Sequence, residues 1–218
     1  MSILFSGCEK DRVQKYIIMF SWESFDWITD AYRDFYLDSY NGDAFVFATE
    51  DELHQHFGQI FSDYNFAYPN ARIISEDEYR IYRYIVETIS RYTFSSRVLR
   101  DYINSVHRDM NFQILDYDAK TRVTFFVKML IGVSEAIETI GLENSRSTRQ
   151  PPRTYYNSPN GNSRFERQLN NCLAYQLDGH FETLASAAQY IASMPWSFIW
   201  DTAICGNEII DGLWEHVR

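Results

Sequence analysis

Three polar residues near the middle of the chain have side chains that could act on a phosphodiester. Arg100 and His107 are seven residues apart, with Asn104 between them, and on a helix the three share one polar face. An Arg in such a position can hold a phosphate while the His moves a proton. The same spacing is common on solvated helix faces. The sequence therefore leaves two interpretations open, a ribonuclease site or an ordinary polar surface.

Glu52, His54 and His56 form a second group of side chains that could bind a metal. On a helix, His54 and His56 diverge by about 200°, so only Glu52 and His56 meet. A metal site needs more ligands than these two. The chain also lacks a G-x-S-x-G motif, an H-E-x-x-H motif and a glycine-rich phosphate loop. We therefore expect no metal, no cofactor and a function that is not enzymatic.

One predicted helix carries a row of carboxylates at successive i,i+4 positions. The row consists of Asp26, Asp30, Asp34 and Asp38. Like charges at this spacing cost about 0.2–0.5 kcal/mol per pair, and Arg33 relieves the cost only in part. The candidate partners are cations from later helices: Arg80, Arg83, Arg91, Arg97, Arg100 and Arg108. Either the acidic face is solvated, or Asp and Arg side chains meet within or between chains.

The three cysteines, Cys8, Cys172 and Cys205, are far apart and lack C-x-x-C spacing, which disfavours a zinc site. Because their number is odd, at least one has no partner within the chain. Either the thiols are buried or idle, or at least one forms a disulfide between chains in an assembled particle. Cys8, near the N-terminus, is the first candidate for such a bond.

Tyr and Arg dominate the segment from residue 78 to 102, which has five of each, and the whole chain has sixteen Arg but four Lys. Protein interfaces are enriched in aromatic residues and Arg and depleted in Lys. We therefore expect a surface that contacts other protein. The candidate contact residues are Tyr79, Arg80, Tyr82, Arg83, Arg91, Tyr155 and Tyr156, together with the four aspartates of the acidic row.

The formal charge of −10 disfavours nucleic acid as a partner, because such binding needs a basic face. The longest apolar run, residues 123–133, includes Lys128 and is shorter than the roughly 20 residues of a membrane span. The N-terminal residues lack the basic leader of an export signal. We therefore expect an intracellular protein that binds neither nucleic acid nor membrane.

Capping residues and apolar periodicity predict a mainly α fold, a multi-helix globular domain. Capping boxes are expected at Thr49/Glu52, Ser75/Glu78 and Ser163/Glu166. The predicted helices cover 9–20, 23–38, two stretches between 75 and 108 separated near 93–96, then 119–141, 164–178, 181–194 and 197–216. Residues 119–141 are the most apolar of these and are expected to form the central helix. A short strand is predicted near 44–48.

Residues 143–163 contain three prolines and little apolar periodicity, which predicts a long exposed loop. The loop divides the chain into an N-terminal helical part, 1–142, and a C-terminal helical part, 164–218, which together form one compact unit. Tyr155 and Tyr156 make the loop a candidate arm that packs on a neighbouring copy.

An acidic, Tyr-rich, mostly helical chain of this size, with few cysteines and no targeting signal, resembles the polyhedrins. These are the occlusion-body proteins of insect viruses, and the resemblance is to the predominantly helical nudivirus kind. It covers the general profile of the whole chain. It implies a structural protein that crystallises around virions in the host nucleus, with copies of itself and the virion surface as partners. It also implies disulfides and exchanged segments at lattice contacts, and dissolution in alkali.

Two other functions are alternatives. The spacing of Arg100 and His107 is similar to a loose pattern in HEPN-type ribonucleases, in which Arg holds phosphate and His transfers a proton. The third hypothesis is an immunity or anti-defence protein of a phage or mobile element, which binds one partner rather than many copies of itself.

Overall fold

The computed structural model describes residues 20–40, 58, 73–91, 101–102, 104–147, 164–194, 197–199, 201–202 and 205. Its elements, in chain order, are η1 (Glu23–Phe25), α1 (Asp26–Asp38), α3 (Glu76–Arg91), η2 (Val106–Arg108), α5 (Met110–Ile114), α6 (Tyr117–Ser147), α7 (Arg164–His180) and α8 (Leu184–Ser193). These residues are mostly helical and contain no strand, which confirms the mainly α prediction. The strand expected at 44–48 lies outside the described residues.

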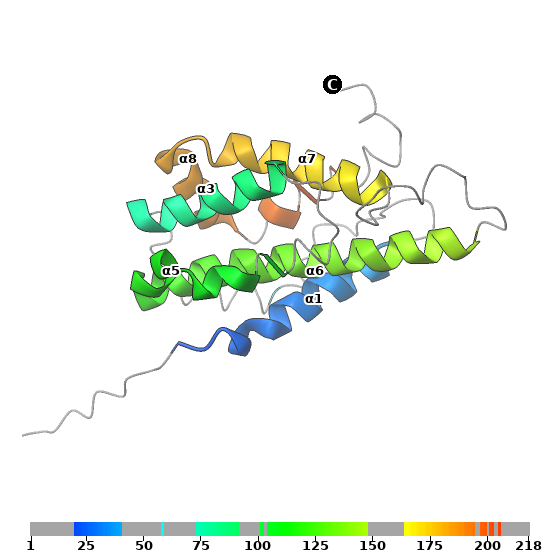
Figure 1. Cartoon of the computed structure of the whole chain (residues 1–218), viewed down its shortest axis with the longest axis horizontal. Helices are drawn as coiled ribbons and strands as arrows, with labels where there is room; N and C mark the ends of the chain where they lie inside the picture. Colours follow the sequence, from blue (N-terminus) through cyan, green and yellow to red (C-terminus); the bar gives the residue numbers. More distant parts are fainter. Residues whose placement is uncertain are drawn as a thin grey trace, which may run out of the picture.

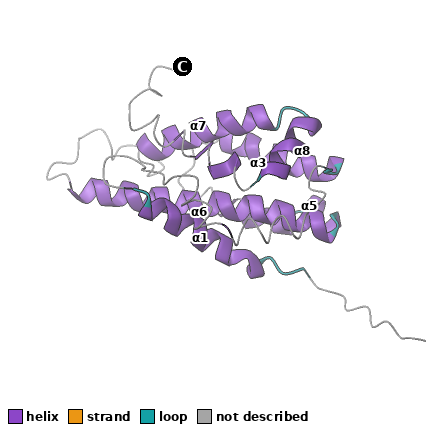
Figure 2. Cartoon of the chain, turned by 180° about the vertical axis from the view of Figure 1, so that it is seen from behind, coloured by secondary structure: helices purple, strands orange, loops and turns teal. Residues whose placement is uncertain are grey.

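The long helix α6 runs through the middle of the described part, with other helices on two sides of it. Figure 1 shows α1 along one side of α6, and α3 and α7 side by side on the other. Seen from behind in Figure 2, helices account for nearly all of the described chain. Because α6 is covered on both sides, every residue from 121 to 134 is buried.

The central helix was expected at 119–141, and the structure confirms it with longer bounds. It begins at Tyr117, where the carboxylate of Asp116 accepts a hydrogen bond of 2.8 Å from the backbone N–H of Ala119 and so caps the helix start. It continues to Ser147, so the first five residues of the predicted loop at 143–163 are helical. The rest of that loop, including Tyr155 and Tyr156, lies outside the described residues.

The other helix starts also follow from their capping residues. Before α3, the hydroxyl of Ser75 accepts a hydrogen bond of 3.1 Å from the backbone N–H of Glu78, as the predicted cap requires. The helices predicted at 164–178 and 181–194 are present as α7 and α8, but α7 continues past Gly179. The capping box of Thr183 and Ser186 starts α8 three residues later than expected.

Gly132 is the point of closest approach between α1 and α6. A β-carbon built on Gly132 would lie 2.5 Å from the carbonyl oxygen of Thr29 and 2.9 Å from the β-carbon of Tyr32. One turn earlier on α6, the carbonyl oxygen of Lys128 accepts a hydrogen bond of 3.2 Å from the Thr29 hydroxyl. Glycine at residue 132 therefore allows the two backbones to pack directly against each other.

Substituting Gly132→Ala is expected to lower the free energy of unfolding by about 1–3 kcal/mol, because the added methyl group meets the backbone of α1. The measurement is urea unfolding followed by circular dichroism. Gly179→Ala is the matched control, since its β-carbon would have nothing within 4 Å. The control should be neutral or slightly stabilising. Equal stability of the two variants would contradict the close packing at Gly132.

Candidate functional site

The short helix α5 exposes large apolar side chains. Phe112 points into the core and is buried, whereas Met110 is 82% exposed and Ile114 is 67% exposed. Residues four apart lie on the same helix face, so these two side chains form one outward surface. Tyr117, at the start of α6, is 45% exposed next to it in sequence. We name Met110, Ile114 and Tyr117 the α5 apolar surface.

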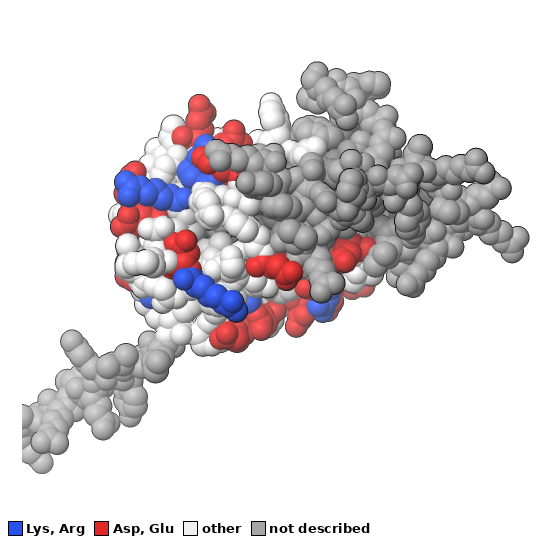
Figure 3. All heavy atoms as spheres, in the orientation of Figure 1, with Lys and Arg blue, Asp and Glu red and all other residues white. Residues whose placement is uncertain are grey.

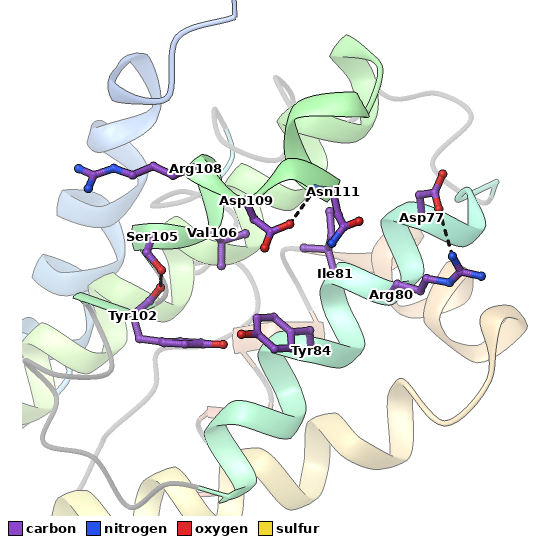
Figure 4. Close-up of a pocket in the computed structure, with 10 residues that line it drawn as sticks. All are labelled: Asp77, Arg80, Ile81, Tyr84, Tyr102, Ser105, Val106, Arg108, Asp109 and Asn111. Atoms are coloured by element: carbon purple, nitrogen blue, oxygen red, sulfur yellow. Dashed lines mark hydrogen bonds and ion pairs between the residues drawn. The ribbon is translucent and has the colours of Figure 1, made fainter.

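A pocket of about 610 Å³ lies between α3 and residues 102–111 (Figure 4). Its apolar lining includes Ile81 and Val106, which are buried. Across from Val106, the rings of Tyr84 and Tyr102 lie with their centroids 5.8 Å apart, tilted by 48°. The volume is in the range typical of ligand and side-chain binding pockets.

Charged groups of both signs surround the uncharged areas of this face. Figure 3 shows Lys and Arg interspersed with Asp and Glu around large areas of neutral atoms. Acidic side chains lie along the lower edge of the described part, where Figure 1 places α1. On the face that Figure 3 shows, neutral areas are thus interspersed with charged side chains of both signs.

His107 and Asn104 line a second pocket, of about 480 Å³. The carbonyl oxygen of Asn104 accepts a hydrogen bond from Nδ1 of His107, and the imidazole lies 4.8 Å from the ring of Trp22. The ammonium group of Lys128 is 4.9 Å from that same Trp22 ring and pairs with Asp26. Arg100, the proposed phosphate-binding residue, lies outside the described residues.

The charges of this second pocket do not favour a phosphodiester. Its lining includes three carboxylates, Glu23, Asp26 and Asp101, against the cations Arg108 and Lys128. In the described lining, Asp26 pairs with Lys128, and Arg108 is the remaining cation beside Glu23 and Asp101. Phosphate sites need an excess of positive charge. The described lining does not supply that excess around His107.

The acidic row of α1 finds its cations on α1 and α6 rather than on α3. Asp26 pairs with Lys128, while Arg33 contacts Asp30 at 2.8 Å and Asp34 at 3.1 Å. Two of the expected arginine partners are occupied elsewhere. Arg80 pairs with Glu76 and Asp77, and Arg83 pairs with Asp178 on α7 and with Glu87. Within the described residues, the contact between the acidic row and the α3 arginines is therefore not formed.

Two tyrosines expected at intermolecular contacts belong to the interior. Tyr82 is fully buried and its hydroxyl donates a hydrogen bond of 3.1 Å to Glu78. Tyr79 is half-buried and donates to the carbonyl oxygen of Phe181 at 3.0 Å. The prediction for Tyr82 was wrong because Tyr82 shares the core-facing stripe of α3 with Ile85. The side chain of Arg91 lies outside the described residues.

A buried ion pair between α3 and α6 was missed by the sequence reasoning. Nε of Arg122 lies 2.8 Å from one carboxylate oxygen of Glu78, and a terminal guanidinium nitrogen lies 2.6 Å from the other. Both side chains are buried. The Ser75/Glu78 capping pattern indicated a helix start, but the Glu78 carboxylate binds Arg122 and Tyr82 instead of the backbone.

Buried tyrosines surround Asp201 in the C-terminal part. The Tyr190 hydroxyl donates to the Asp201 carboxylate at 2.8 Å, and that of Tyr36 donates to the carbonyl oxygen of Ile199 at 3.4 Å. Burial, with the charge of Asp201 added, raises the pKa of Tyr36 and Tyr190 well above the usual value of about 10. Burial also raises the pKa of Tyr32, with a further contribution from Tyr36.

Cys172 and Cys205 form a disulfide within the chain, with their Cα atoms 5.6 Å apart. Both residues are fully buried. This pairing removes them from the candidates for a bond between chains. Cys8, which remains a candidate, lies outside the described residues.

Comparison with family models, with curated proteins and with solved structures finds no match to this chain. In the described part, no group of three or more His, Cys, Asp or Glu side chains is arranged to hold a metal ion. None of the helices described there is both long and apolar enough to cross a membrane.

Proposed function

We propose that this chain is a structural protein that assembles with copies of itself into a dense, ordered body. The polyhedrin resemblance suggests an occlusion body around virions in the host nucleus. The observation that carries the proposal is the α5 apolar surface, where Met110 and Ile114 are 82% and 67% exposed. Exposed apolar surface of this kind marks contact with other protein.

Exposed apolar side chains on other elements support a lattice rather than a single dimer. Ile73, just before α3, is 77% exposed, and Tyr175 on α7 is 67% exposed. A lattice requires each copy to make several different contacts at once. Large apolar side chains on separate parts of the described chain provide the chemistry for such contacts.

The test is imaging of expressing cells by electron microscopy, with sedimentation velocity of the purified protein. Dense bodies in cells and species of many copies in solution are expected. A chain that stays monomeric at every concentration would contradict the proposal. A stable complex with one other protein would favour the immunity or anti-defence hypothesis, and RNA cleavage that His107→Ala abolishes would favour the ribonuclease.

The assembly should dissolve in strong alkali because its core tyrosines ionise. The pKa values of Tyr32, Tyr36 and Tyr190 are raised in the folded chain, so folding favours their neutral forms. The free energy that these three pKa differences add to folding is fully present below the unfolded-state tyrosine pKa of about 10. It is lost as the pH rises toward the pKa values of the folded state. Turbidity and circular dichroism, followed against pH, should therefore stay constant at neutral pH and fall above about pH 10.

Tyr36→Phe should shift the alkaline transition to higher pH, because it removes one buried ionisable hydroxyl. Tyr84→Phe is the matched control for the circular-dichroism transition of the unassembled chain, in which Tyr84 is 53% exposed, and it should leave that transition unchanged. Dissolution that begins below about pH 8, or an equal shift in both variants, would contradict a trigger in the core tyrosines.

A further inference from the structure

The pocket between α3 and residues 102–111 has an acidic and aromatic interior. In Figure 4, Asp109 and Asn111 lie on the α5 side of the space and the rings of Tyr84 and Tyr102 on the opposite side, whereas the guanidinium groups of Arg80 and Arg108 point away from it. Carboxylate oxygens and aromatic faces both attract a guanidinium group. The pocket interior is therefore suited to an arginine side chain from outside the chain.

Two neighbouring residues at this pocket have opposite charges and no ion-pair partner among the described residues. The Asp109 carboxylate accepts a hydrogen bond of 2.7 Å from the backbone N–H of Asn111, and within the described residues it forms no ion pair. Arg108 is exposed and lines the second pocket together with Glu23 and Asp101, but its guanidinium forms no ion pair with any described carboxylate. Arg80, by contrast, is held by Glu76 and Asp77. Arg108 and Asp109 are thus adjacent in the chain and carry opposite charges that no ion pair uses within the described residues.

The α5 apolar surface directly follows these two charges in the sequence. Met110 comes next after Asp109, Ile114 lies on the same face of α5 as Met110, and the exposed Tyr117 follows at the start of α6. An area with an apolar part, a cation and an anion is complementary to a second copy of itself. In a two-fold interface, residue i of one copy contacts residue j of the other, and j contacts i.

From these observations, which rest on the proposed self-assembly, we infer that the building block of the assembly is a two-fold dimer. Arg108 of each copy enters the pocket of the other, pairs with Asp109 and stacks on Tyr84. The α5 apolar surfaces of the two copies are buried together. In this dimer, the group that fills the pocket is the Arg108 guanidinium of a second copy of this chain.

Charge exchange tests the dimer, with dissociation constants measured by sedimentation equilibrium. Arg108→Glu should weaken dimerisation on the order of a hundredfold, because each interface then holds two pairs of like charges. Asp109→Lys should do the same, and the double variant R108E/D109K should recover most of the affinity, since the exchanged charges again attract. Glu182→Lys, an equal charge change at an exposed residue of the α7–α8 turn, should leave the affinity unchanged.

Asp109 also caps α5, so Asp109→Lys changes both the charge and the start of this helix. A second variant separates the effect of the charge on dimerisation from the effect of the cap on folding. Asp109→Asn keeps an oxygen that can accept the hydrogen bond from Asn111 but removes the charge, and it should weaken dimerisation with unchanged helical content. Wild-type affinity in Arg108→Glu, or failure of the double variant to recover while it remains folded, would overturn the inference. Either result leaves the proposed function intact if wild-type bodies still form, whereas a wild-type chain that never associates would overturn both.

Discussion

Substituting Arg122→Met is expected to lower the free energy of unfolding by about 3–5 kcal/mol. Arg122 makes two short contacts, 2.8 and 2.6 Å, with the carboxylate of Glu78, which is fully buried. Methionine fills much of the same volume but cannot donate a hydrogen bond. Within the described residues, the Glu78 carboxylate then loses its bidentate cation and keeps only the Tyr82 hydroxyl as a donor. Removing one partner of a buried ion pair lowers the free energy of unfolding by far more than the intact pair adds to it. The remaining charge is then kept away from water without an opposite charge beside it.

Two further variants make this expectation specific to the buried charge. The double variant E78Q/R122M removes both charges and keeps an amide oxygen that can accept from Tyr82, so it should recover most of the lost stability. Arg80→Met removes an exposed arginine whose side chain is 69% accessible, and it should cost less than about 1 kcal/mol. Urea unfolding of the four proteins measures all these differences. A double variant as unstable as Arg122→Met would show that packing, and not the unpaired carboxylate, accounts for the loss.

Reduction of the Cys172–Cys205 disulfide is expected to lower the free energy of unfolding by about 3–4 kcal/mol. The two cysteines are 33 residues apart, and the bond limits the conformations of the unfolded chain over that span. Both residues are fully buried, so reduction also leaves two thiols in the core. The double variant C172A/C205A should show a similar loss.

Unfolding in urea, with and without a reductant, measures the contribution of the disulfide. The comparison is made in a Cys8→Ser background, which prevents exchange with the third cysteine. The reductant should lower the stability of the Cys8→Ser protein but leave the triple variant C8S/C172A/C205A unchanged. Equal stability of the Cys8→Ser protein in both conditions would show that the disulfide does not support the fold.

The apolar pattern of the sequence was sufficient to predict the main helices but not how they pair. The central helix was predicted because residues 123–133 are apolar on every face, which requires cover from all sides. Nothing in that pattern indicates that Gly132 is the contact with α1, because close approach depends on which helix lies opposite. In the sequence, Lys128 only interrupts the apolar run, and the pattern does not indicate a partner for it. In the structure its ammonium group pairs with Asp26, 102 residues away.

The prediction of contact residues was wrong at Tyr82, because tyrosine suits both a surface and a core. Tyr82 was expected at a contact between chains because interfaces are enriched in aromatic residues and Arg, yet its ring packs against Phe126 and Phe181. Met110 and Ile114 were not selected, since apolar residues four apart ordinarily indicate the buried face of a helix. In α5 that face is outside because Phe112 and Leu115 occupy the core. Only tertiary packing determines which of the two apolar faces is buried.

The disulfide has a topological consequence beyond stability. Together with the backbone from Cys172 to Cys205, it closes a covalent ring that contains the end of α7 and all of α8. A protease that cuts once anywhere within this ring opens it but cannot separate the two fragments, which stay joined through sulfur. After a cut outside the ring, this disulfide does not join the two fragments. Under oxidising conditions, the chain on both sides of a cut within the ring therefore stays covalently joined. In a reducing compartment, the same cut breaks the covalent link between the residues after it and the rest of the chain.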